Sequence, residues 1–196
     1  MDTRKTPARM NKGERRTQIL NAAMTVFVKK GFTASTTLEI AKAANVSEVT
    51  LFRHFASKQE IFLAGIEPIL LSTLEGSISL SADLDPAEKL EYILSERITL
   101  ISRNCQVVKL ILSEASLLSA IDSESFMSRI IQTLQNVLVL IGVPKQGEAF
   151  VLRILMGSIL SFIYMPQTGE ESIRAFARQV AAMVLNNTDQ IEREDD

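Results

Sequence analysis

The chain has 196 residues, a formal net charge of −2 and a hydrophobic share of 46%. This length can bury a core without disulfides or metal, and the single Cys105 allows no internal disulfide, which suits a reducing cytoplasm. Residues 1–12 lack the apolar core of a secretory signal, and the most apolar run, residues 154–165, is too short and interrupted to cross a bilayer. We therefore expect a cytoplasmic protein without a membrane segment, metal or other cofactor.

The charges are distributed unevenly along the chain. Residues 1–63 hold 11 Lys and Arg against 5 Asp and Glu, a formal charge of +6, while the rest holds 10 against 18, a formal charge of −8. A basic N-terminal segment on an acidic body is what binding of a phosphate backbone by one end requires.

The first elements follow from local signals. Residues 1–13 are polar and basic without an apolar stripe, and we expect a flexible basic arm there. From residue 14 a helical period places Ile19, Ala23 and Phe27 on one face, and Gly31 ends this helix.

Two short helices follow, joined by a tight turn. Thr36 and Glu39 have the spacing of a capping box at the start of a second helix. Asn45 ends it, because asparagine tolerates the left-handed conformation that a tight turn between helices requires. Ser47 then caps a third helix, predicted for residues 48–55, with Leu51 and Phe55 facing inward.

The remaining chain shows no persistent alternation of period two, so it is predicted to be helical as well. Gly, Pro and capping residues divide it into helices over residues 58–80 (with interruptions at Pro68 and Gly76), 86–102, 104–118, 122–141, 147–165 and 170–187. Residues 189–196 are predicted to form an acidic tail. The fold class is therefore all-α.

The segment from Thr17 to Ile66 resembles the DNA-binding domain of the tetracycline-repressor (TetR) family. The resemblance lies in TQILNAAMTVFVKKGF, STTLEIAKAANVS and EVTLFRHFASKQEIF, which arrive in the family's order and spacing. It implies about nine helices, with a three-helix helix-turn-helix DNA-binding domain at residues 14–60 and an effector-binding and dimerisation domain at residues 61–188. It also implies a cytoplasmic homodimer that binds a palindromic operator on double-stranded DNA and represses transcription until a small molecule releases it.

In such a domain the second helix of the motif enters the major groove. Arg53 and Thr50 are best placed to reach base edges, Arg53 through a bidentate contact to guanine. Glu48 would accept from cytosine, or would only favour the positive end of its own helix. The expected phosphate contacts come from the basic arm and from Thr36, Thr37, Ser47, His54 and Lys58.

These contacts have simpler alternatives, and the motif departs from the family at three positions. Thr36 and Ser47 would be wanted as caps in any protein, and His54 would suit the exposed end of a helix. Asn45 replaces the usual glycine of the turn, Val49 lies where a small residue is frequent, and Phe52 replaces a tyrosine that commonly binds phosphate. Phe52 therefore keeps only apolar contact with sugar or a thymine methyl, and Val49 and Phe52 complete the predicted DNA-binding residues.

The C-terminal helices offer candidates for an interface and a pocket, each with plain core packing as the alternative. By resemblance, the last two helices would pair with their copies in a four-helix bundle through Phe150, Ile154, Gly157, Ser158, Ser161, Phe162, Phe176, Val180, Met183 and Val184. The candidate pocket residues are Tyr92, Arg103, Lys109, Glu114, Phe126, Met127 and Met156. The apolar, tryptophan-free helices favour a lipophilic ligand.

Two other function classes remain to be weighed. An enzyme is disfavoured, because the single histidine and single cysteine lie far apart and the chain has neither a phosphate loop nor metal-ligand spacing. An architectural or protein-docking DNA binder with the same fold but no small-molecule effector stays open as an alternative.

Overall fold

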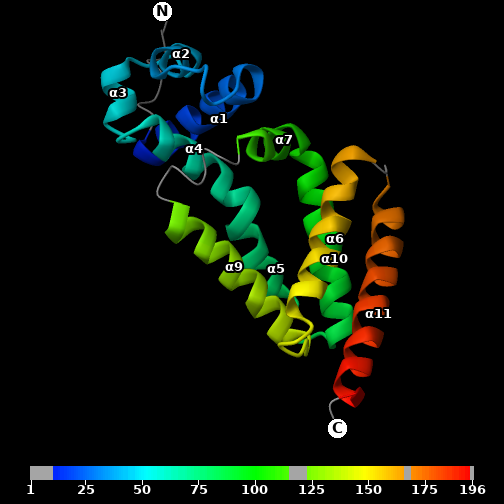
Figure 1. Ribbon diagram of the computed structural model, residues 1–196. Coiled ribbons are helices and arrows are strands. Elements are labelled where there is room, and N and C mark those ends of the chain that lie inside the picture. Colours follow the sequence, from blue (N-terminus) through cyan, green and yellow to red (C-terminus); the bar gives the residue numbers. More distant parts are fainter. Residues whose placement is uncertain (1–10, 115–122, 166–168, 195–196) are drawn as a thin grey trace, which may run out of the picture. The chain divides into compact units, whose positions relative to one another are not determined.

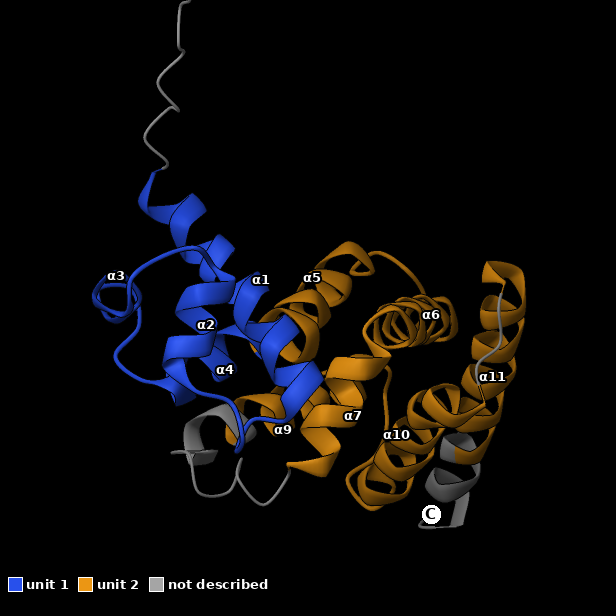
Figure 2. Ribbon diagram, turned by 90° about the horizontal axis from the view of Figure 1, so that it is seen from above, with its two compact units in different colours: residues 1–66 blue, residues 67–196 orange. Residues whose placement is uncertain are grey.

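The computed structural model describes residues 11–114, 123–165 and 169–194, except the side chains of residues 123–127 and 188–194. Every regular element in these stretches is a helix (Figure 1). Counting the continuous helix from Lys58 to Leu80 once, they contain nine helices, which confirms the predicted all-α class. The chain forms two compact units, one up to Ile66 and the other from Glu67 (Figure 2), where the sequence placed a domain boundary after residue 60.

The first unit contains α1 (Lys12–Lys30), α2 (Thr37–Ala43), α3 (Glu48–Phe52) and all but the last residue of α4 (Lys58–Glu67). A capping box between Asn11 and Glu14 starts α1, so Lys12 and Gly13 are helical and the predicted arm is two residues too long. Residues 1–10 of that arm lie outside the described residues. Gly31 ends α1 as predicted, with φ of 84° and its N–H donating to the carbonyl of Phe27 at 2.8 Å.

Aromatic side chains form the core of the first unit. The rings of Phe27, Phe32 and Phe62 lie 5.0–5.5 Å apart between centroids, and Phe27 and Phe62 have no exposed surface. Ile40 from α2 and Leu51 from α3 are equally buried. Each helix of the unit is therefore anchored by apolar side chains, and the burial of each contributes about 1.5–3 kcal/mol.

The second unit contains η1 (Pro68–Ser72), α5 (Thr73–Leu80), α6 (Pro86–Arg103), α7 (Cys105–Ser113), α9 (Ser123–Leu140), α10 (Glu148–Tyr164) and α11 (Glu170–Glu194). Asp85 caps α6 with Pro86 in its first turn, as predicted. α6 packs against α5, α7, α10 and α11, and its apolar face meets those of α10 and α11 in the main core. α6 is therefore the central helix of the second unit, and it holds these four helices in place through its contacts with them.

A π-helical turn, η1, interrupts the helix from Lys58 to Leu80 at Pro68. Proline lacks an N–H, and its ring clashes with the carbonyl four residues earlier, so a regular α-helix cannot continue through it. Thr73 donates through Oγ1 to the carbonyl of Pro68 at 2.9 Å, which occupies a carbonyl oxygen in this turn. The predicted interruption at Gly76 is absent, because α5 runs through it.

Two other predicted helix ends differ from those of the structure. α7 ends at Ser113 rather than residue 118, and residues 115–122 lie outside the described part of the chain. α11 continues to Glu194, so residues 189–194 of the predicted acidic tail are helical. Acidic side chains are unfavourable at the C-terminus of a helix because of the helix dipole. Glu and Arg are nevertheless good helix formers, so a helix already stabilised by packing can continue through them.

One described helix, Lys58–Leu80, is long and apolar enough to cross a membrane by length and composition alone, contrary to the expectation that no segment would be. Its side chains Ile61, Phe62, Ile66 and Leu71 have no exposed surface within the protein. A third of the apolar window is buried inside the protein, and a helix of this length and composition is by itself weak evidence for a membrane segment.

Candidate nucleic-acid interface and effector cavity

Caps and a tight turn position α3 in the first unit. Asn45 has φ of 51°, the left-handed conformation predicted for it, and the N–H of Val46 donates to the carbonyl of Ala41 at 2.9 Å. Ser47 accepts at Oγ from the N–H of Thr50 at 3.1 Å and lies 3.0 Å from Thr50 Oγ1. The predicted cap is confirmed, and the hydroxyl of Thr50 is oriented by the cap.

The two faces of α3 differ sharply in exposure. Leu51 is fully buried and Phe55, just beyond the helix, is 1% exposed, as predicted. Val49 is 72% and Phe52 48% exposed, and Arg53 is exposed beside them. The structure thus brings together on one accessible face three of the residues predicted to bind DNA, among them Arg53, which was predicted to read base edges.

α3 is shorter than predicted, because it ends at Phe52 and not at residue 55. The N–H of His54 donates to Leu51 O at 3.0 Å, a tighter bond than the α-helical one, and Ser57 Oγ accepts from the N–H of Glu60 at the start of α4. The inward Phe55 thus belongs to the corner between helices, and Arg53 is the C-cap residue of α3.

Glu48 and Thr37 bond to each other. Thr37 Oγ1 donates to Glu48 Oε1 at 2.8 Å, which ties the start of α2 to the start of α3. The predicted cytosine contact of Glu48 and the predicted phosphate contact of the Thr37 hydroxyl therefore compete with an internal bond.

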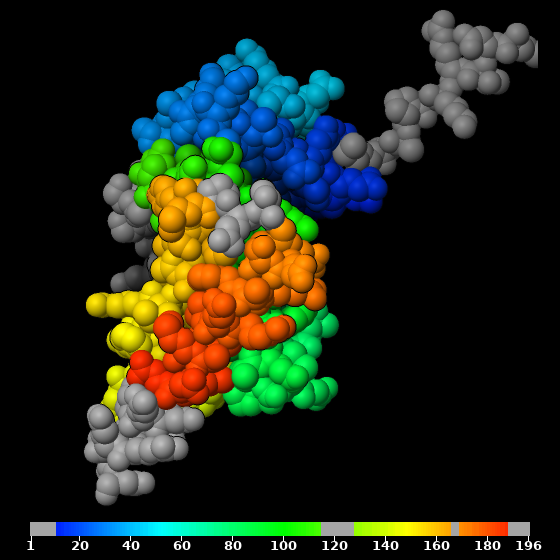
Figure 3. All heavy atoms as spheres, turned by 90° about the vertical axis from the view of Figure 1, so that its right-hand side faces the viewer, coloured from blue at the N-terminus to red at the C-terminus, as the bar shows by residue number. Residues whose placement is uncertain are grey.

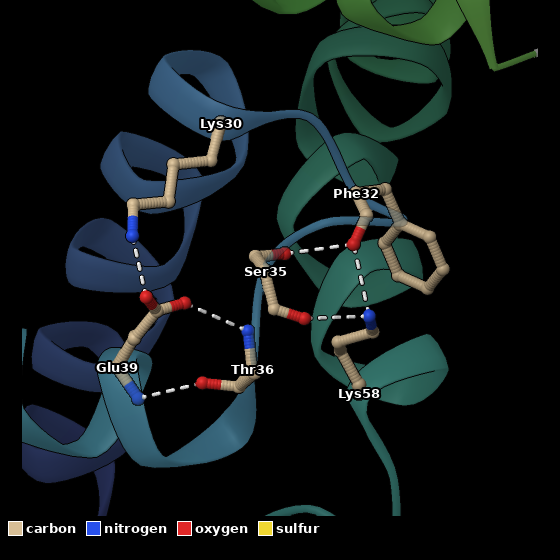
Figure 4. A network of polar contacts seen from close by, with 6 residues as sticks. All are labelled: Lys30, Phe32, Ser35, Thr36, Glu39 and Lys58. Carbon is tan, nitrogen blue, oxygen red and sulfur yellow. Dashed lines mark hydrogen bonds and ion pairs between the residues drawn. The ribbon is translucent and has the colours of Figure 1, made fainter.

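Lys58 closes the loop between α1 and α2 (Figure 4). Its Nζ donates to the carbonyl oxygens of Phe32 at 2.9 Å and Ser35 at 2.8 Å, and lies 4.5 Å from the centre of the Phe32 ring. An ammonium group used in this way holds carbonyls that the loop leaves without helical partners. This geometry gives Lys58 a role in closing the loop, and the predicted phosphate contact would have to compete with these bonds.

The capping box of α2 lies in the same view (Figure 4). Thr36 Oγ1 accepts from the N–H of Glu39 at 3.2 Å, and the N–H of Thr36 donates to Glu39 Oε2 at 3.0 Å, as predicted. Lys30 pairs with the same carboxylate and, together with the Thr36 N–H, lowers the pKa of Glu39. The Thr36 hydroxyl is thus engaged as a cap, while its side chain remains exposed.

Basic groups gather around His54. Burial, followed by the charges of Lys12, Arg53, Arg16 and Arg15, lowers the pKa of its imidazole below the usual 6.5. Nδ1 has no exposed surface and no hydrogen-bond partner among the described residues. Four cations around a neutral ring form a region of positive potential beside α3, which suits a phosphate group.

Two supporting residues were not predicted from the sequence. Arg16 donates to the carbonyl of His54 at 3.1 Å and lies 4.1 Å from the centre of the Phe55 ring. Gln18 donates to the carbonyl of Ala44 at 2.9 Å. Both come from α1 and fix the chain on either side of α3, and only their position early in a basic helix could have indicated this.

The second unit contains a cavity of about 300 Å³ lined by side chains of η1, α5, α6, α7, α9 and α10. Its described lining is apolar except for Arg97. The volume lies at the lower end of the range for small-molecule sites. The arrangement suits a compact lipophilic ligand.

Sequence reasoning identified little of this lining. Met156 lines the cavity, whereas Tyr92, Arg103, Lys109 and Glu114 do not, and the side chains of Phe126 and Met127 lie outside the described residues. Arg103 and Lys109 are exposed. Tyr92 packs against Leu74, Ile93 and Val137, which line the cavity, but Tyr92 is not itself a lining residue. The prediction assigned polar residues on apolar helices to the pocket, but most of these side chains face solvent.

Arg97 was missed although a pattern marked it. It continues the stripe of Ile93 and Ile101 on α6 at spacings of four, where an apolar residue belongs. Only 6% of it is exposed, and its guanidinium donates to Thr73 Oγ1 at 2.7 Å and to the carbonyl of Ile69 at 2.6 Å. Burial lowers the pKa of Arg97 to about 10, so it is cationic at neutral pH.

α10 and α11 form a second accessible surface, whose helices run from yellow to red in Figure 3. A shallow groove there is lined by Arg153, Ile154, Gly157, Ser158, Phe176, Gln179, Val180 and Met183, six of which were predicted for the interface. Phe150 and Met183 are each 50% exposed. Apolar residues exposed beside a glycine suit close packing against another helix.

Three residues predicted for the interface belong to the core of the unit. Phe162 and Val184 are 4% and 2% exposed, and Val180, though it borders the groove, is 7% exposed. The ring of Phe162 lies 5.1 Å from that of Phe176 in an edge-to-face contact. Ser161 is half-buried, with its hydroxyl donating to Ser158 O. Helical periodicity identified the apolar face of these helices, but it could not distinguish the residues buried in the core from those exposed at the groove.

Comparison with known proteins connects these features to a family. The model of the family described as "Bacterial regulatory proteins, tetR family" matches residues 19–64. The HTH-type transcriptional regulator YvkB of Bacillus subtilis is 62% identical over 42 residues, which cover 21% of this chain and 22% of YvkB. The HTH-type transcriptional repressor NicS of Pseudomonas putida is 34% identical over 97 residues, covering 48% of this chain and 46% of NicS. The chain thus spans less than half the length of these curated relatives.

The fold of both units recurs in solved structures. A TetR-like transcriptional regulator from Rhodococcus sp. RHA1 superposes with a TM-score of 0.71 at 20% identity, covering 91% of this chain and 99% of that one. At this identity the likeness concerns the fold. The expectation that the chain is no enzyme agrees with these relatives, whose descriptions name transcriptional regulators.

Proposed function

We propose that the chain, whose residues 19–64 match the model of the tetR family of bacterial regulatory proteins, is a ligand-responsive transcriptional repressor of that family. In this proposal a homodimer binds a palindromic operator through α3, and a small lipophilic effector releases it. The observation that carries the proposal is the presence, in one chain, of a helix-turn-helix unit with an exposed α3 and a second unit with an apolar cavity.

The DNA contacts follow from the exposed face of α3. Arg53 and Thr50 read base edges, while Val49 and Phe52 make apolar contacts in the major groove. The cations around His54 and the N-termini of α2 and α3 neutralise phosphates. Glu48, Thr37, Thr36, Ser47 and Lys58 serve mainly to hold these helices in place, through the bonds described above.

The experiment that tests DNA recognition is selection of bound sequences from a random pool. A dimer should enrich two inverted half-sites whose centres lie roughly 34 Å apart, one turn of the double helix, or a multiple of that distance. A matched double variant, Val49→Ala with Arg53→Ala, should fold normally and enrich no such palindrome. Absence of an enriched palindrome with the unmodified protein would contradict the proposal.

The dimer is tested at the α10–α11 groove. Phe150→Glu with Met183→Glu places charges on side chains that are half exposed in the monomer, so the fold should survive while association fails. Light scattering should report a monomer, and operator affinity should fall with it. Val139→Glu, at a side chain 69% exposed on α9, is the matched control and should remain dimeric.

The cavity favours an effector over the alternative of an architectural DNA binder without one. Leu134→Trp fills the cavity from α9, whereas Val139→Trp on the same helix points to solvent. An effector that lowers operator affinity of the unmodified protein should act on the Val139 variant and fail on the Leu134 variant. Equal release in both variants would remove the cavity from the proposal.

A further inference from the structure

Arg97 is a charge placed where the cavity otherwise offers only apolar groups. Arg97 lies in a lining built from residues such as Leu70, Leu94 and Leu155, and the residue is 6% exposed. Its two hydrogen bonds go to the carbonyl of Ile69 and the hydroxyl of Thr73. Both acceptors are neutral, so they satisfy N–H groups without balancing the charge.

No carboxylate in the described part of the chain forms an ion pair with Arg97. The ion pairs of the second unit join Arg129 to Glu67, Arg174 to Glu170 and Arg178 to Glu91, all at the surface. A buried cation without a counter-ion is unfavourable, because desolvation is not offset by attraction to an opposite charge. Burial is the cause that lowers the pKa of Arg97, yet at about 10 the group still carries its proton at neutral pH.

The structural role of Arg97 does not require a positive charge. Its bonds fasten the π-helical turn η1 through the Ile69 carbonyl, and the start of α5 through the Thr73 hydroxyl. A neutral donor such as a glutamine amide could make bonds of the same kind. The charge therefore points to a binding partner that supplies the missing negative group.

We propose that the cavity binds an aliphatic carboxylate, with the carboxylate on the guanidinium of Arg97 and the hydrocarbon chain along the apolar lining. This inference rests on the proposed function in taking the cavity as the effector site. A planar carboxylate matches the fork of N–H groups on a guanidinium, which a single neutral acceptor does not. The remaining lining offers the chain only apolar contacts.

The cavity volume sets the size of the ligand. With about 30 Å³ for each water-sized group, 300 Å³ holds about ten non-hydrogen atoms. Octanoate has this size, so octanoate is the probe, and 1-octanol and octylamine are the matched neutral and cationic chains. All three share the same hydrocarbon chain and differ in the group that would meet Arg97.

Calorimetry with the purified full-length protein, in the absence of DNA, tests the assignment. We expect octanoate to bind about 10- to 100-fold more tightly than 1-octanol, as for a charged hydrogen-bonded contact, and octylamine to bind most weakly. Arg97→Met should remove this preference while 1-octanol still binds, and Arg97→Lys should retain part of it. If Arg97→Met does not fold, the comparison of the three probes on the unmodified protein still decides.

Several results would overturn the inference. These are 1-octanol binding as tightly as octanoate, no binding of any probe, or an octanoate preference that persists unchanged in Arg97→Met. Octyl phosphate binding where octanoate does not would show that another anion is recognised. Each of these outcomes is read without DNA, so none depends on the operator.

Operator affinity measured in parallel separates this inference from the proposed function. If octanoate binds through Arg97 but leaves operator affinity unchanged, the carboxylate site stands and release by the effector fails. If a neutral compound releases the operator while octanoate shows no preference, the regulator stands and the carboxylate site fails.

Discussion

Lys58 and Arg97 make the same kind of contact in the two units of the molecule, yet their surroundings differ. Lys58 donates to main-chain carbonyls in the first unit, where it is half-buried beside the Phe32 ring. Arg97 donates to a carbonyl and a hydroxyl inside the second unit, within an apolar cavity. A charge at the partly exposed edge of a unit can be solvated by water, whereas a charge buried in an apolar lining leaves an electrostatic demand that a ligand can meet.

The largest effect should come from breaking the surface contact. Lys58→Met keeps most of the hydrocarbon stem but removes the donors to Phe32 and Ser35, and we expect the free energy of unfolding to fall by about 3 kcal/mol. Urea unfolding followed by circular dichroism measures this loss. Operator affinity of the folded variant should be unchanged; unchanged stability with weaker binding to all DNA sequences would instead restore the phosphate contact expected from the sequence.

At Arg53 we expect a smaller effect, which lowers operator affinity and leaves stability nearly unchanged. Because its side chain is exposed and takes no part in the ion pairs of the described residues, Arg53→Ala should leave stability within about 0.5 kcal/mol of the unmodified protein. The operator complex should weaken by about 2 kcal/mol, roughly 30-fold, with preference relaxed at one base pair. Fluorescence anisotropy with operators altered one position at a time gives both quantities. Full affinity in this variant would remove Arg53 as a reader.

The cap at Thr36 should contribute less. Thr36→Ala removes the acceptor for the N–H of Glu39, and stability should fall by about 1 kcal/mol. Thr25→Ala is the matched control, because its hydroxyl only bonds back to Asn21 O within α1, and it should change stability by less than about 0.5 kcal/mol. Equal losses in both variants would argue against the capping box as a source of stability.

The smallest effect concerns pH. The pKa of His54 lies below 6.5 in the folded state, so as pH falls through 6.5 the unfolded chain takes up a proton before the folded one does. His54 therefore makes the protein less stable below pH 6.5 and has no such effect above it. As the only histidine, it can be titrated by its ring signals in NMR, and His54→Gln should flatten this part of the stability profile. A measured pKa at or above 6.5 would contradict the electrostatic picture.

The parts of the molecule that could be predicted are those set by neighbours in sequence. Thr36 with Glu39, Asn45 and Ser47 each act on residues within a few positions, and all four have the predicted conformation or bond. Lys58 depends on carbonyls 23 to 26 positions earlier, so nothing local distinguishes its role from a phosphate contact.

The cavity could hardly be predicted, because six helices contribute to it and its shape depends on how they pack. Arg97 is the exception, since a charged residue on the buried stripe of α6 was visible in the sequence. The length of α11 was also underestimated, because an acidic composition suggested a tail where packing of earlier turns carries the helix forward.

The residues that build α3 are different from the residues that face outward, and this separation affects how the protein could evolve. The groups that build the helix, Ser47, Leu51 and Phe55, are capped or buried, while Val49, Phe52 and Arg53 face outward. Exposed positions of this kind tolerate exchange with little change in stability. Under the proposed function, a duplicated copy of the gene could acquire a new operator by exchanging the outward residues alone, while its folding and the cavity of its second unit stay unchanged.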